Sequence, residues 1–280
     1  MNTDDGKNYL TGKEILDEQV HIGEKKGIRQ YFLQSVINGC MAGAFLALGA
    51  FAAMVASHGI SDYGIAKLIN AVVFPVGLIL IVICGGELFT SNTLLIQARL
   101  EGKITSKIYV SNLVIIYFTN AIGAASIAGL IMGAGILHND ANMLGGYVIH
   151  VAATKIHYTF MQDVCSGIMC NILVCCAAWG ASAAKDVAGK ILMIWFAIMA
   201  FIIGGFEHCV ANMFYFGLAL MAKNCPDFIL ASKIEPDALA NLDWAGVMHN
   251  LIPVTIGNIL GGAVFIGMAY WVVYFRGYKR

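Results

Sequence analysis

The chain has 280 residues, of which 59% are hydrophobic and only 12% are charged, with a net charge of zero. Soluble domains carry about 25% charged residues, so this composition argues against a soluble domain. Nothing in it points to nucleic-acid binding, and we expect an integral membrane protein.

The first 29 residues are polar and charged, and they contain no apolar core of a signal peptide. Thr11 and Glu14 have the spacing of a capping box, which predicts a helix from about Lys13 to Lys26. Several apolar residues give this helix an apolar side. We therefore interpret residues 1–29 as an amphipathic helix at the membrane interface.

Six windows of the chain are long and apolar enough to cross a bilayer core, which takes about 20 residues. They lie between the charged residues at 29–62, 67–99, 107–140, 163–185, 190–223 and 243–276. A single glutamate interrupts the second window, and another interrupts the fifth. We expect an all-α membrane protein with six spanning helices in residues 30–275.

The basic residues indicate how these helices are oriented. Six spans place both termini on the same side of the membrane, and that side holds 13 of the 17 lysines and arginines. The remaining four are Lys67, Lys155, Lys223 and Lys233. Because loops rich in lysine and arginine stay inside the cell, we expect both termini to be cytoplasmic in a cell membrane, with 276–280 as a short tail.

The two halves of the chain resemble each other. Phe, Gln, Val, Gly and Met recur in register when residues 32–41 are compared with residues 160–169. A Gly-Gly pair followed by a glutamate and an asparagine occurs in the second span, at 85–92. The same pattern occurs in the fifth span, at 204–212.

With three spans each, the two halves, about 30–137 and 157–275, cross the membrane in opposite directions, as an inverted 3+3 repeat. Each glycine weakens a helix by about 1 kcal/mol. Broken backbone at membrane depth is tolerated where it is buried in protein or lines an aqueous cavity. Matched breaks in inverted halves are typical of a transport site near the midplane. We expect spans two and five to be broken there, with close packing by small residues as the alternative.

Three ionisable side chains lie at these breaks, Glu87, Glu207 and His208, and the cost of burying a charge makes each a functional candidate. His208 is preferred because an imidazole can donate a proton to an anion in a dry, narrow path; a structural histidine is the alternative. Thr90 lies at the matching break, so its hydroxyl is expected either to face His208 or to bind helix backbone. The two glutamates are expected to support the broken backbone outside the lumen.

Other residues near the breaks complete the candidate site. Lys155 precedes the fourth span on the outer side and could concentrate anions at the mouth, although a lone loop lysine is usually only solvated. Large apolar side chains flank the breaks and could form constrictions that exclude hydrated ions, with core or lipid-facing packing as the alternative. These side chains are Phe74, Leu78, Leu88, Phe89 and Phe201.

Residues 85–91 (GGELFTS) and 205–213 (GFEHCVANM) resemble the two hallmark segments of the formate/nitrite transporter family. Residues 155–160 (KIHYTF) are similar to the lysine segment before that family's fourth span. The resemblance covers about 28–275. It implies an aquaporin-like fold, a homopentamer with one pore in each protomer, and transport of formate, nitrite or hydrosulfide.

The resemblance also implies roles for individual residues. The family's central histidine matches His208, its pore threonine matches Thr90, and its vestibule lysine matches Lys155. Its pore-lining asparagine matches Asn171, and its constrictions match the five apolar residues named above. The residues expected to support the site are Glu87, Glu207 and Asn212.

Other classes of protein fit less well. A water or glycerol channel would carry paired Asn-Pro-Ala motifs, which this chain lacks, so a neutral-solute channel is the alternative. An intramembrane hydrolase needs a nucleophile and a base, and no such motif occurs near His208. No two cysteines have C-x-x-C spacing, and we expect no metal, cofactor or enzymatic activity. Three questions stay open: which anion is carried, whether protons are coupled to it, and whether the N-terminal helix gates the pore.

Overall fold

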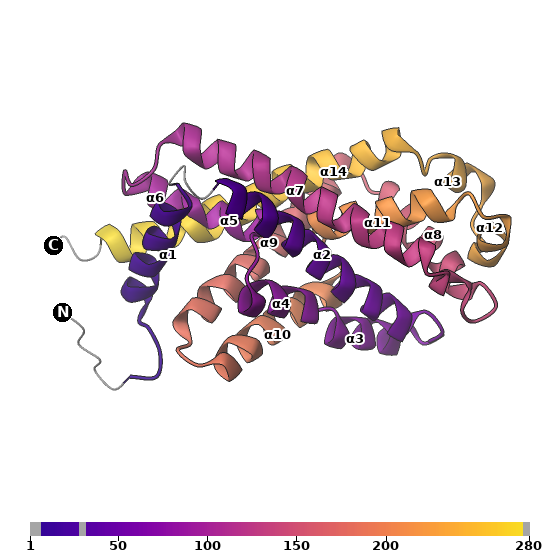
Figure 1. Ribbon diagram of the computed structural model, residues 1–280, viewed down its shortest axis with the longest axis horizontal. Helices are drawn as coiled ribbons and strands as arrows, with labels where there is room; N and C mark the ends of the chain where they lie inside the picture. Colours follow the sequence, from indigo (N-terminus) through magenta and orange to yellow (C-terminus); the bar gives the residue numbers. More distant parts are fainter. Residues whose placement is uncertain (1–6, 28–31, 277–280) are drawn as a thin grey trace.

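The computed structural model describes residues 7–27 and 32–276, where the regular structure is helical apart from one isolated bridge between Tyr9 and Ala184. Six helical segments in these ranges are long and apolar enough to span a membrane (Figure 1). The expected all-α class with six spanning helices is therefore confirmed. Apart from Arg276, the predicted tail at 276–280 lies outside the described residues.

The first half of the chain contains three of the spans. Its elements are α1 (Gly12–Lys26), α2 (Phe32–Ser57), α3 (Tyr63–Val73), α4 (Val76–Cys84), α5 (Phe89–Asn92), η2 (Thr93–Leu95), α6 (Ile96–Leu100), α7 (Ser106–Gly133) and η3 (Ile136–His138). α3 and α4 form one span that ends at Cys84, and the next helix begins only at Phe89. Gly85 ends α4 with φ +93°, a conformation that residues with a Cβ rarely adopt.

The second half of the chain contains the other three spans. It comprises α8 (Met143–Ile156), α9 (Phe160–Ala183), α10 (Val187–Gly204), α11 (Cys209–Ala222), α12 (Pro226–Ser232), α13 (Pro236–Ala240), α14 (Trp244–Ile259), η4 (Leu260–Met268), α15 (Ala269–Trp271) and η5 (Val272–Arg276). A second break separates α10 from α11, and Gly205 has φ +68° there. The segments from α14 to η5 continue one another, and η4 and η5 are wound as π-helix.

Polar side chains set where several helices begin. The carboxylates of Asp62, Asp186 and Asp243 accept hydrogen bonds from backbone N–H groups in the first turns of α3, α10 and α14. The hydroxyl groups of Thr105 and Thr159 do the same for α7 and α9. Caps of this kind contribute about 1 kcal/mol each. Because each precedes an apolar run, the chain enters each of these helices at a defined residue.

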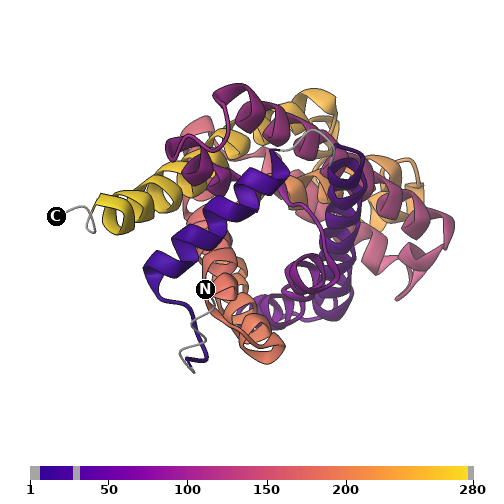
Figure 2. The ribbon, with the colours of Figure 1, turned by 60° about the vertical axis from the view of Figure 1, so that its left-hand side comes forward.

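α1 lies across the end of the bundle where α6 and the C-terminal helix also lie (Figures 1 and 2). The backbone N–H and the hydroxyl of Thr11 both donate to Glu14, over 2.6 and 2.7 Å. These hydrogen bonds hold the pKa of Glu14 below its usual value. Ile15 and Leu16 pack with Trp179 of α9 in an apolar cluster. The helix is thus docked on the bundle by its apolar side.

Small residues allow spans in each half to approach closely. A Cβ on Gly123 of α7 would lie 1.9 Å from the carbonyl oxygen of Cys40 in α2. A Cβ on Gly257 of α14 would lie 2.3 Å from the carbonyl oxygen of Val164 in α9. Close packing therefore accounts for glycines in the spans. It does not account for Gly85 and Gly205 at the two breaks, where φ is positive.

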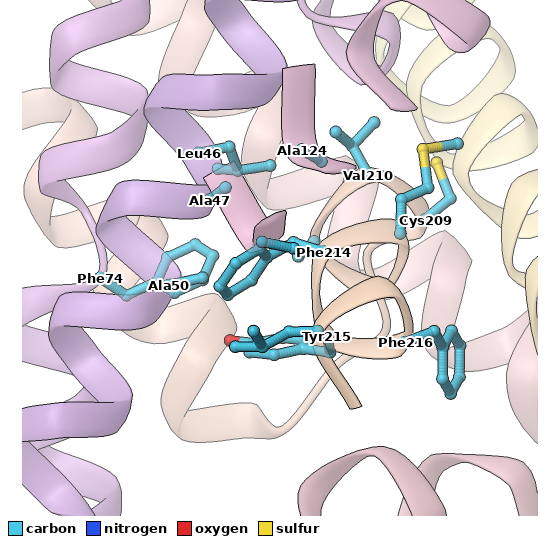
Figure 3. Packing of buried hydrophobic residues seen from close by; sticks show 14 of the residues in the cluster. Leu46, Ala47, Ala50, Phe74, Ala124, Cys209, Val210, Phe214, Tyr215 and Phe216 are labelled. Atoms are coloured by element: carbon cyan, nitrogen blue, oxygen red, sulfur yellow. The ribbon is translucent and has the colours of Figure 1, made fainter. Parts of the chain in front are cut away.

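α11 is the most enclosed of the short helices, and its position places His208 inside the molecule. Buried residues surround almost its whole circumference, which is typical of a core helix. Figure 3 shows Val210 and Phe214 of α11 in one buried cluster with Leu46 and Ala47 of α2 and with Phe74. Because His208 caps this helix, its ring is held at the break between α10 and α11.

Candidate functional site

His208 and Thr90 meet where the two broken spans come together. Thr90 Oγ1 and His208 Nε2 lie 2.9 Å apart, and the two residues are 0% and 3% exposed. His208 Nδ1 accepts a hydrogen bond from the backbone N–H of Ala211. A neutral imidazole that accepts at Nδ1 carries its proton on Nε2, so His208 donates to the Thr90 hydroxyl. The proton of that hydroxyl is then available to another acceptor.

Two cavities, each of about 460 Å³, lie on either side of this pair. We call the cavity beside α3 and α8 the outer cavity; it reaches His208 and Ala211. We call the cavity beneath α1 the inner cavity; it reaches Leu88 and Ser91, close to Thr90 in the chain. His208 thus lines the outer cavity, and residues that flank Thr90 in the chain line the inner one.

Two aromatic rings line the outer cavity beside His208. The rings of Phe74 and Phe201 meet edge to face with centroids 5.8 Å apart, and the Phe201 ring lies 6.0 Å from the His208 ring. Phe74 and Phe201 are 1% and 2% exposed. Both line the outer cavity next to His208, so a solute that approaches the imidazole from this cavity passes these rings.

The other predicted constriction residues take different positions. Leu88 lines the inner cavity next to Thr90. Leu78 is buried in the apolar core and lines neither cavity. Phe89 also lines neither cavity and packs edge to face on Tyr117, with ring centroids 5.0 Å apart. The structure thus brings Phe74 and Phe201 to the wall of the outer cavity and Leu88 to the wall of the inner one.

Glu207 differs from its predicted position outside the lumen, since it lines the outer cavity. Its Oε1 accepts a hydrogen bond of 2.7 Å from Lys155 Nζ, and its Oε2 accepts one of 2.6 Å from Asn212 Nδ2. The cation compensates the carboxylate, so the pair has no net charge to repel an anion. Lys155 lies in the last turn of α8 rather than in a loop.

Glu87 has a similar set of partners on the inner side. Its Oε1 accepts from the Ser35 hydroxyl at 2.8 Å, and its Oε2 accepts from Asn92 Nδ2 at 3.0 Å. Lys26 Nζ lies 3.4 Å from the same Oε2 and also donates to Asn92 Oδ1. Each break therefore holds one glutamate that accepts from the asparagine five residues further along the chain and is compensated by one lysine from another helix.

Two asparagines that sequence reasoning missed hold the broken backbone in place. Asn120 of α7 accepts from the N–H of Phe89 and donates to the carbonyl oxygens of Gly39 and Glu87. Asn258 of α14 makes the equivalent three bonds to Cys209, Gly167 and Glu207. A signal was present in the sequence, because each is an asparagine three residues before a glycine in the third span of its half.

Asn171 lies behind the site and lines neither cavity. Its Nδ2 donates to the carbonyl oxygens of Asn258 and Thr90, over 2.6 and 3.2 Å, and the residue is 0% exposed. It therefore joins the α5 end of one break to α14 of the other half. In this structure it positions Thr90 rather than lining a passage.

A six-span membrane protein whose two broken helices meet between two cavities belongs to the class of membrane channels and transporters. The chain is a member of the formate/nitrite transporter family, whose family model matches residues 13–272. The recognition of this family from its motifs is therefore confirmed.

Known proteins resemble the chain over most of its length. It is 37% identical to the formate channel FocA of Haemophilus influenzae over 266 residues, covering 92% of this chain and 93% of that protein. It is 35% identical to FocA of Escherichia coli K12 over 240 residues, or 84% of each chain. A solved pentameric formate channel with formate bound superposes with a TM-score of 0.79 at 34% identity, covering 89% of this chain and 99% of that one.

Proposed function

We propose that the chain carries small monovalent anions of weak acids across the membrane, with formate, nitrite and hydrosulfide as candidate substrates. Formate is the first candidate because the relatives named above are formate channels and one of them has formate bound. The observation that carries the proposal is the pair of His208 and Thr90 between two cavities.

The pair is suited to receive an anion and to supply it with a proton. His208 donates to the Thr90 hydroxyl, and the hydroxyl proton can then be donated to an anionic oxygen or sulfur. When the imidazole takes up a proton from water at Nδ1, giving up the hydrogen bond from the Ala211 N–H, its Nε2 proton can pass through the Thr90 hydroxyl to the anion and leave a neutral imidazole. The central residues would therefore bind the anion and protonate it.

A comparison of magnitudes favours passage as the neutral acid. Moving a carboxylate-sized ion from water into a medium of low dielectric constant costs on the order of 20 kcal/mol in the idealised limit. Protonating a carboxylate of ordinary pKa near 4 at pH 7 costs about 4 kcal/mol. Phe74 and Phe201 on one side of the central pair and Leu88 on the other are apolar, so an anion would bear a large part of the desolvation cost there. Protonation costs less than this desolvation.

We also infer the assembly and the topology. A homopentamer with one pore in each protomer is supported by the pentameric relative. Cytoplasmic termini in a cell membrane are supported by the 13 basic residues on that side. In this proposal residues 1–29 form a cytoplasmic segment, 30–275 form the channel domain, and 276–280 form the tail. The matched bonds of Asn120 and Asn258 support an inverted repeat in the channel domain.

Uptake by proteoliposomes of the purified protein tests the proposal. Formate, nitrite and hydrosulfide are compared with glycerol, each with and without a pH gradient, and with empty liposomes. We expect at least one anion to enter faster than in empty liposomes, and an inward proton gradient to accelerate it. Glycerol flux without anion flux would instead favour the neutral-solute channel, and absence of any flux would reject transport of these solutes.

A further inference from the structure

The outer cavity contains two lysines, and only one has a carboxylate partner. Lys155 and Lys67 both line the cavity, together with Glu207 and His208. The ammonium of Lys155 is bound to Glu207 over 2.7 Å, so its charge is compensated. Lys155, which the sequence suggested as the group that attracts anions, is thus committed to an internal ion pair.

Lys67 is in a different situation. It lies near the start of α3 and reaches the break between α10 and α11, where a Cβ on Gly205 would lie 3.2 Å from its Nζ. Within residues 7–27 and 32–276, no carboxylate forms an ion pair with it. Among the ionised side chains that line the outer cavity, which are Lys67, Lys155 and Glu207, Lys67 is therefore the one outside the ion pair, and the three together carry one net positive charge.

We propose that Lys67 is the anion-recruiting residue of the outer cavity, holding small anions electrostatically beside the break before they pass Phe74 and Phe201 to His208. This inference rests on the proposed transport of anions. A cation in a cavity with low-dielectric walls raises the local concentration of anions and their rate of entry. Lys67 is suited to this role because, among the described residues, no carboxylate is in contact with its ammonium, and the nearby Glu207 is paired with Lys155.

The alternative to anion recruitment is a purely structural role for Lys67. The end of α10 presents backbone carbonyl groups near Gly205, and a lysine placed there can stabilise the negative end of the helix dipole. Such a role would affect folding and the maximal rate. It would not make the apparent affinity for the anion depend on salt concentration, so the two roles are distinguishable.

Right-side-out membrane vesicles that contain the full-length protein allow the outer cavity to be tested directly. Initial rates of formate uptake are measured over a range of external formate at low and high ionic strength, for wild type, Lys67→Gln, Lys67→Arg and Lys233→Gln. Lys233 is the matched control, because it is an exposed lysine after α12 that does not line the outer cavity. Its replacement removes the same charge from the same side.

We expect Lys67→Gln to raise KM for formate about fivefold at low salt, the factor that one unit charge contributes at close range in water. The maximal rate should change little, and the difference should shrink in 0.5 M salt, to roughly the extent that the Debye length shortens. Lys67→Arg should restore KM, and Lys233→Gln should resemble wild type. The KM of wild type should itself rise with salt concentration, and this measurement does not depend on whether any variant folds.

Two results would overturn the inference. One is a KM for Lys67→Gln equal to that of wild type and Lys233→Gln at low salt. The other is a salt-independent wild-type KM together with a loss of maximal rate that arginine does not restore, which indicates a structural role. Absence of formate, nitrite and hydrosulfide uptake by wild type would instead reject the proposed function, so the two failures are distinguishable.

Discussion

Replacement of Lys155 by glutamine removes the cation that compensates Glu207. The two groups are 2.7 Å apart and Glu207 is only 2% exposed. Removal of one partner from a buried ion pair costs about 3–5 kcal/mol because a charge is left without compensation. The remaining partners of Glu207, Asn212 and Asn250, are neutral amides that cannot replace the lost charge. We expect Lys155→Gln to be destabilised by about 3 kcal/mol and to lose most anion uptake.

A double variant tests whether the lost stability comes from the uncompensated charge of Glu207. Lys155→Gln with Glu207→Gln leaves two neutral side chains at the same place, so most of the lost stability should return. Glu207→Gln alone should cost less than Lys155→Gln, because the Lys155 side chain is 16% exposed and can be hydrated from the outer cavity. Unfolding in detergent with denaturant and formate uptake by proteoliposomes measure the two effects. A Lys155→Gln variant as stable as wild type, or a double variant no more stable than Lys155→Gln, would refute the reasoning.

Three further predictions concern the break, the central pair and the N-terminal helix. Asn258→Ala removes three hydrogen bonds and leaves buried backbone groups unpaired, so we expect a loss of about 3 kcal/mol in unfolding experiments. Thr90→Val should lower formate uptake about tenfold because it leaves His208 without its buried acceptor, whereas Thr90→Ser should retain uptake. The pKa of Glu14 is lower in the folded protein than in the unfolded chain. The cap of α1 therefore contributes its full stability at pH values above the unfolded-state pKa, and this contribution is lost as the pH falls through the folded-state pKa. The protection factors of the α1 amides, which correct for the pH dependence of intrinsic exchange, should therefore fall in acid for wild type but depend less on pH in Glu14→Gln.

The fold and the central pair could be predicted because their signals are local. Six apolar windows define the spans, and the Gly-Gly pairs before Glu87 and Glu207 mark the places where the helices are interrupted. Because Thr90 and His208 follow matching breaks, contact between them was one of the two positions expected for the Thr90 hydroxyl, and the structure places the two side chains in hydrogen-bond contact.

The remainder depends on contacts between distant segments. Asn120 and Asn258 are uncharged residues in apolar spans, so a search for buried charges passes over them; only the fold shows that they bind broken backbone. Lys155 was placed in a loop because α8 is too short and too weakly patterned to be recognised as a helix. Phe89 and Leu88 are neighbours, but the direction of the chain where α5 begins turns one toward Tyr117 and the other toward the inner cavity.

The role of His208 is the central claim, and the pH dependence of formate flux tests it most directly. Formate uptake and internal acidification are followed together in proteoliposomes of wild type and His208→Asn, with external pH stepped from 7.5 to 5.5 and with unfolding in detergent as the control for intact protein. We predict that wild type transports formate faster as external pH falls and acidifies the lumen in step, and that His208→Asn loses this dependence. An unchanged pH profile in folded His208→Asn would contradict the account, because the proton would then reach the anion without the imidazole.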